Sequence, residues 1–70
     1  MEPREVFGAN VRRLRARRGL SQEALADACE LHPTEISRLE RGVRDPRLAT
    51  IARVARALDV APARLLEGIR

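Results

Sequence analysis

Residues 20–42 read LSQEALADACELHPTEISRLERG and contain the signals for two short helices in succession. Ser21 is a good N-cap, because its hydroxyl can accept a hydrogen bond from a free N–H of the first helical turn. It predicts a helix over residues 22–29. Pro33 has the fixed backbone angle of a first helical position, so it predicts a second helix over residues 33–41, ended by a glycine. The stretch therefore predicts two helices joined by about three residues.

The second helix of this pair has two different faces. Ile36 and Leu39 lie three residues apart and are expected to face a core. Polar residues form a stripe on another face: Thr34, Ser37 and Arg38. His32 stands at the cap position, and Glu35 is placed to reach back to it as in a capping box. By itself such a stripe is also typical of an ordinary solvated helix face.

Helical signals continue on both sides of this stretch. Apolar residues recur at helical spacing before it and after it, and no segment has the alternation of a strand. Gly19 can end the first helix in a left-handed conformation. The further helices are expected at residues 6–18, 48–59 and 62–68. The sequence therefore predicts an all-α fold, a compact five-helix bundle that forms a single domain over residues 1–70.

Length and composition indicate which side chains fill the core and in which cellular compartment the protein is expected. Hydrophobic residues make up 44% of the 70 residues and aromatic residues 1%, so aliphatic side chains must fill the core. Cys29 is the only cysteine; it cannot form an internal disulfide and is expected to be a small buried residue. The N-terminal residues lack the apolar run of a signal peptide, and no segment has the length of a membrane span. We therefore expect a soluble, cytoplasmic protein.

The charge balance favours an anionic partner such as nucleic acid. Fourteen basic residues against ten acidic ones give a net charge of +4, and the sequence pI is about 11.2. Every basic residue is arginine, which genomic composition can also favour. Five arginines gather in the first predicted helix: Arg12, Arg13, Arg15, Arg17 and Arg18. Basic residues near a helix C-terminus also stabilise the helix through its dipole, so a structural role is open as well.

The chain resembles the phage-repressor-like helix-turn-helix family (Cro/C1-type, XRE) from Phe7 to Leu66. The resemblance is carried by Arg15, Leu20-Ser21-Gln22, Ile36-Ser37, Glu40-Arg41-Gly42, Pro46, Ala57-Leu58 and Leu65-Leu66. Leu31-His32-Pro33-Thr34 is further similar to small stand-alone regulators of this family, including controller proteins of restriction-modification systems.

The resemblance implies a sequence-specific DNA-binding transcriptional regulator whose second helix enters the major groove. It makes Gln22 a phosphate contact at the start of the first helix of the pair. It places five residues where base edges are contacted: His32, Pro33, Thr34, Ser37 and Arg38. Three arginines would meet the backbone or the adjacent minor groove: Arg41, Arg44 and Arg47. Arg15 and Glu40 are implied to form a partly buried ion pair between two helices.

A homodimer on a symmetric double-stranded operator is the expected assembly. One module buries only about 600–1,000 Å² on DNA, which is usually too little for tight specific binding. The expected dimer interface consists of apolar residues near the C-terminus, unless the core of the single chain uses them: Leu65, Leu66 and Ile69.

Several positions depart from the family pattern. Glu30 and Asp59 stand where glycine is usual, so each is expected to adopt a left-handed conformation, at a cost on the order of 1 kcal/mol for Glu30. Three residues replace the usual serine or threonine caps: His32, Arg47 and Ala61. Glu35 would repel phosphate if its carboxylate pointed outward.

Other function classes find less support in the sequence. No nucleophile has a base beside it, no glycine-rich phosphate loop is present, and one histidine with one cysteine makes no metal site, so we expect no enzyme, no cofactor and no metal. The alternative is an antitoxin-like or other protein-binding module with the same fold. Salt-dependent binding to DNA upstream of its own gene would favour the regulator, and a large exposed apolar surface on the last helix would favour the protein-binding module.

Overall fold

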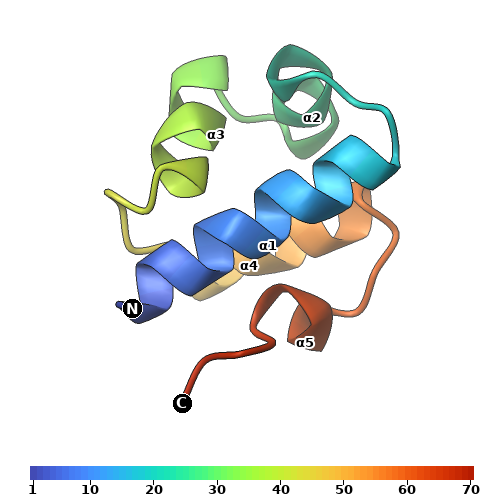
Figure 1. Ribbon diagram of the computed structural model, residues 1–70. Helices are drawn as coiled ribbons and strands as arrows, with labels where there is room; N and C mark the ends of the chain where they lie inside the picture. Colours follow the sequence, from blue (N-terminus) through green and yellow to red (C-terminus); the bar gives the residue numbers. More distant parts are fainter.

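The computed structural model describes residues 1–70 and contains five α-helices and no strand (Figure 1). The helices are α1 (Pro3–Arg17), α2 (Gln22–Cys29), α3 (Pro33–Glu40), α4 (Leu48–Ala57) and α5 (Pro62–Leu65). In Figure 1, α1 crosses the middle of the molecule, with α2 and α3 above it, α4 behind it and α5 below it. The predicted all-α five-helix fold is confirmed. No helix combines the length and the hydropathy that a membrane span requires.

One core of twelve buried apolar side chains receives residues from all five helices. Its members are Phe7, Val11, Leu14, Leu25, Ala26, Cys29, Ile36, Leu39, Val54, Ala55, Leu58 and Leu65. Only one of them is aromatic, as the composition predicts. Cys29 is buried as predicted, and this burial raises the pKa of its thiol.

Three helix boundaries differ from the predicted ones: the start of α1 and the ends of α3 and α5. α1 begins at Pro3, three residues before the predicted start, because Glu2 and Glu5 form a capping box in which the Glu2 backbone N–H donates to Glu5 Oε1 at 2.8 Å. α3 ends at Glu40, so Arg41 is the C-cap and not the last helical residue. The last helix is shorter than predicted and ends at Leu65.

The helix caps divide into confirmed and wrong predictions. The Ser21 hydroxyl accepts a hydrogen bond from the Ala24 N–H at 3.0 Å, as predicted. His32 also caps α3, because its Nδ1 accepts from the Thr34 N–H at 3.1 Å. The predicted return of Glu35 to this cap is wrong, because the Glu35 carboxylate pairs with a loop arginine instead. Glu30 and Asp59 adopt the predicted left-handed conformation, with φ of 59° and 56°.

Gly8 allows α1 and the end of α3 to lie in backbone contact. A Cβ atom at this position would collide with the carbonyl oxygen of Leu39 and lie 2.8 Å from that of Glu40. Both obstacles are backbone atoms, so a side chain here cannot be accommodated by a rotamer change. The glycine therefore fixes the distance between the central helix and the helix with the polar stripe.

Asn10 is a buried polar residue that holds the C-terminal segment against α1. Its Nδ2 donates to the carbonyl oxygens of Leu65 at 2.8 Å and Glu67 at 2.9 Å. Its Oδ1 accepts from Arg13 Nη1 at 2.9 Å, so both ends of the amide are satisfied. Asn10 is 5% exposed. Its hydrogen bonds hold the non-helical segment that follows α5.

Candidate nucleic-acid interface

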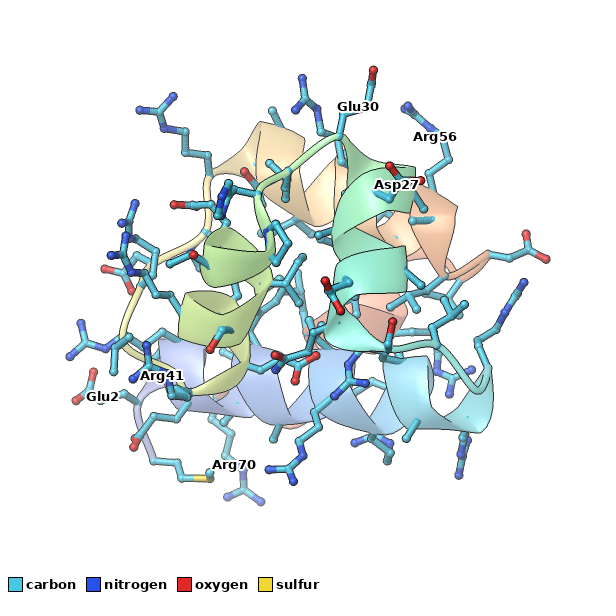
Figure 2. The ribbon with its side chains drawn as sticks, turned by 90° about the horizontal axis from the view of Figure 1, so that it is seen from above. Glu2, Asp27, Glu30, Arg41, Arg56 and Arg70 are labelled. Atoms are coloured by element: carbon cyan, nitrogen blue, oxygen red, sulfur yellow. The ribbon has the colours of Figure 1, made fainter.

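The polar stripe lies on the outer face of α3, as the alternation of apolar and polar residues requires. Ile36 and Leu39 are fully buried on the opposite face, under α3. His32, Pro33, Thr34 and Arg38 are exposed, and Ser37 is partly buried. Figure 2 views the molecule from the side of α2 and α3, with Arg41 at the end of α3. The structure therefore brings the five predicted base-contact residues together on one open surface.

An ion pair fixes α3 to α1. Arg15 Nε donates to Glu40 Oε2 at 2.5 Å, and Arg15 Nη2 donates to Glu40 Oε1 at 3.0 Å. Arg15 Nη1 donates to the carbonyl oxygen of Leu20 at 2.7 Å. The side chains of Arg15 and Glu40 are 15% and 4% exposed, and the hydrogen bond to Glu40 raises the pKa of Arg15. The pair is thus largely withdrawn from solvent and bidentate, which gives it both strength and a fixed geometry.

Gln22 joins this network at the start of α2. Its Nε2 donates to Glu40 Oε1 at 3.0 Å, so the carboxylate receives hydrogen bonds from two helices. Gln22 is partly buried and lies at the first helical position after the Ser21 cap. The residue predicted to contact phosphate is therefore held in place from within the protein. Because this carboxylate joins α3 to both α1 and α2, it fixes the start of α2 against the end of α3.

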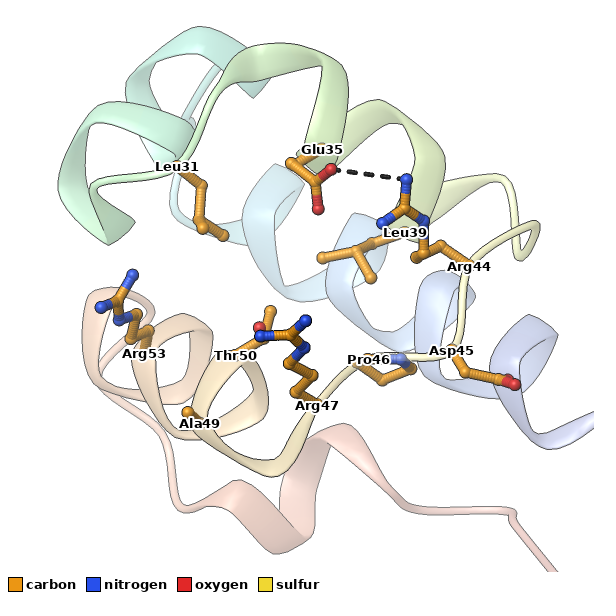
Figure 3. A pocket seen from close by; sticks show the side chains of 10 residues that line it. All are labelled: Leu31, Glu35, Leu39, Arg44, Asp45, Pro46, Arg47, Ala49, Thr50 and Arg53. Carbon is orange, nitrogen blue, oxygen red and sulfur yellow. Dashed lines mark ion pairs between the residues drawn. The ribbon is translucent and has the colours of Figure 1, made fainter.

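Arginines of the segment after α3 border an open cavity of about 410 Å³ between α3 and the start of α4 (Figure 3). Arg44 Nη2 lies 3.6 Å from Glu35 Oε1. Arg47 is exposed, forms no ion pair and is the N-cap of α4 without a side-chain cap. Arg53 and Thr50 line the other side. Three arginines and one inward-facing carboxylate give this cavity a positive balance of charge.

Free cations surround the polar face of α3. The structure contains five ion pairs, and none of them includes Arg38, Arg41 or Arg47. All three are exposed, so their charges are available to an anionic partner. No group of three histidine, cysteine or carboxylate side chains lies close enough to hold a metal ion.

The predicted dimer interface needs one correction. Leu65 is fully buried in the core of the single chain, so its side chain is not available to a partner. Leu66 is 39% exposed and Ile69 is partly buried, and both lie in the segment that Asn10 holds. Asn10 and Gly8 themselves were not predicted, because their roles depend on contacts with residues far along the chain.

Two helices of eight residues, joined by a short turn and with the second exposed on its polar face, define a helix-turn-helix protein. The helix-turn-helix family model HTH_3 matches residues 11–65. The control protein C.BamHI of Bacillus amyloliquefaciens is 45% identical over 65 residues, which cover 91% of this chain and 80% of that protein. The chain therefore belongs to the HTH_3 helix-turn-helix family.

Two further relatives agree with this assignment. The control protein C.SmaI of Serratia marcescens is 39% identical over 66 residues, covering 94% of this chain and 79% of that protein. The crystal structure of the restriction-modification controller protein C.AhdI from Aeromonas hydrophila superposes with a TM-score of 0.86 at 40% identity, covering 89% of this chain and 94% of that one.

Proposed function

We propose that this protein is a DNA-binding transcriptional regulator that recognises its operator with α3. The observation that carries the proposal is the exposed polar face of α3, which includes Arg38 and is flanked by Arg41 and Arg47. None of these three arginines has an ion-pair partner. A helix fits the major groove, and free cations beside it can neutralise the phosphates on either side. Such a regulator would act in the cytoplasm, where a bacterial cell keeps its DNA.

In this proposal the residues divide by the DNA groups they meet. The base edges are contacted by His32, Pro33, Thr34, Ser37 and Arg38, and the phosphates or the minor groove by Gln22, Arg41, Arg44 and Arg47. The similarity to C.BamHI, C.SmaI and C.AhdI supports the narrower role of a controller protein for a restriction-modification system. Genes for an endonuclease and a methyltransferase beside its own gene would support that role.

Arg38→Ala is expected to weaken operator binding by about 1–3 kcal/mol and to relax the preference at one base pair per half-site, because an arginine can bind both acceptors of a guanine edge. Arg47→Ala removes a phosphate contact, so it should weaken binding on all sequences and flatten the salt slope by about one unit. The measurement is a titration on the operator, on its single-base variants and on random duplex at several salt concentrations.

Arg56→Ala is the matched control for these variants. Arg56 is exposed on α4 without an ion pair, and Figure 2 shows it beyond α2, away from α3. The Arg56→Ala substitution removes the same unit of positive charge and should leave the affinity for DNA nearly unchanged. Equal losses for Arg38→Ala on every sequence would show that Arg38 contacts the backbone and not a base.

We also propose that two copies bind together, with Leu66 and Ile69 at their interface. Two-fold symmetry places the two α3 helices on the same side of the duplex, with half-site centres about 10 bp apart. Hydroxyl-radical footprinting on operators with altered spacing should show that the loss of about 5 bp, half a turn, abolishes paired protection. Protection of a single half-site at saturating protein would contradict the dimer.

A further inference from the structure

We propose that Glu35 is an intramolecular competitor for Arg44 and lowers the affinity of the protein for DNA of any sequence. The proposal rests on the proposed function, since it assumes that the surface of α3 and the segment after it meet the duplex. It assigns to Glu35 a role in the strength of binding and none in the choice of sequence.

The position of the Glu35 carboxylate follows from the cap of α3. His32 Nδ1 already accepts the Thr34 N–H, and the Glu35 side chain makes no return bond to the cap. It turns instead toward the segment after α3, where its Oε1 lies 3.6 Å from Arg44 Nη2 (Figure 3). A carboxylate on the helix that faces DNA is thereby directed at a cation that DNA would also attract.

The ion pair between Glu35 and Arg44 is weak enough for a phosphate to replace the carboxylate. Its separation of 3.6 Å is longer than the roughly 2.7–2.9 Å of a direct charge-assisted hydrogen bond. The side chains of Glu35 and Arg44 are 34% and 47% exposed, so water screens their attraction. An approaching phosphate can therefore take Arg44 from Glu35, but the carboxylate opposes it and remains nearby as a negative charge.

Two carboxylate residues line this cavity, Glu35 and Asp45, and only the Glu35 carboxylate is directed at Arg44. Figure 3 shows Asp45 pointing away from it, and Asp45 Oδ2 lies 4.0 Å from Arg4 Nη1. The remaining charged side chains around the cavity are Arg47 and Arg53. Glu35 is thus the only lining carboxylate that is turned toward the arginines of this cavity. Its replacement changes the local charge, and Glu35 is not a member of the buried core.

A glutamate on a recognition helix could instead accept a hydrogen bond from a cytosine amino group, which would make it a specificity residue. The orientation toward Arg44 favours the competitor, and the two roles differ in a measurable way. A base contact changes preference at one base pair. A competitor for a phosphate-binding arginine changes affinity equally on all sequences.

The test is Glu35→Gln, titrated on a duplex selected by the wild type from a randomised pool and on a random duplex of equal length. Both affinities should rise about three- to tenfold near 0.1 M salt, because phosphate no longer competes with Glu35 for Arg44. The salt slope should change by less than about one unit, because Arg44 meets phosphate in both proteins. The ratio of the two affinities should stay within about twofold. In an Arg44→Gln background the gain should fall to about twofold or less.

Asp59→Asn is the matched control, because Asp59 Oδ2 lies 3.9 Å from Arg18 Nη1 in an exposed pair after α4, outside the surfaces proposed to meet DNA or the partner copy. Asparagine also tolerates the left-handed conformation of this position. It should leave both affinities within about twofold of the wild type. The competitor role would be overturned if Glu35→Gln lost affinity, kept the wild-type affinity, or changed the preference at one base pair. In each of these cases, salt-dependent binding by the wild type would still support the proposed function. A wild type without salt-dependent duplex binding would overturn both.

Discussion

Glu40→Ala is expected to lower the free energy of unfolding by about 3–5 kcal/mol, because it leaves a buried charge without its partner. The Arg15 guanidinium would keep only the carbonyl oxygen of Leu20, and the Gln22 amide would lose its acceptor. A folded domain is stable by about 0.05–0.15 kcal/mol per residue, so this loss is a large part of the total. Urea denaturation followed by circular dichroism at several temperatures gives the free energy directly.

The comparison with Arg15→Ala and the double variant isolates the interaction. The double variant should be more stable than the sum of the two losses predicts, because it removes both charges together. Glu67→Ala, in the exposed pair with Arg64, should cost less than about 1 kcal/mol. Additive losses in the Arg15 and Glu40 variants would show that the pair contributes no coupling energy.

Gly8→Ala is the second large effect, with an expected net loss of about 2–3 kcal/mol of stability. Alanine favours a helix over glycine by about 1 kcal/mol, so helix propensity alone predicts the opposite sign. The new methyl group would collide with backbone oxygens at the end of α3, and α1 and α3 would have to separate. The shift in melting temperature, together with operator affinity, measures both the loss and the displacement of α3.

Ala9→Gly is the control on the same helix. Ala9 is exposed on α1, whereas Gly8 beside it in the sequence is buried against the end of α3. This change should cost only about 0.5–1 kcal/mol, which is the backbone entropy of glycine in a helix. A stabilised Gly8→Ala protein would mean that the two backbones do not need to approach so closely.

The sequence predicts correctly those helix starts that depend on interactions within one helical turn. Ser21 and Pro33 place the starts of α2 and α3 correctly, because a cap hydroxyl and a fixed φ act within one helical turn. The start of α1 was missed because the capping box of Glu2 and Glu5 lies outside the apolar repeat. Apolar periodicity locates a helix in the core and does not mark where its exposed first turn begins.

The parts of the site that the sequence did not predict depend on tertiary contacts. Gly8 has no turn to explain it, and only the approach of α3 gives it a role. Glu35 fits a capping box in the sequence, but a competing acceptor on His32 and a cation on the next segment decide where its carboxylate lies. The sequence leaves open whether Leu65 belongs to the core or to an interface, because it does not show which of two adjacent leucines, Leu65 or Leu66, points inward.

The amide of Asn10 has a consequence for the order in which the chain folds. Its two hydrogen bonds join residues 55 and 57 positions apart, whereas the helix-turn-helix is built from neighbouring residues. Closing a long loop carries an entropy cost that grows with its length, and it is compensated only once both ends are in place. We therefore expect the Asn10 hydrogen bonds to the C-terminal segment to form late in folding. The segment that carries Leu66 and Ile69 is thus expected to reach its native position after the helix-turn-helix has formed.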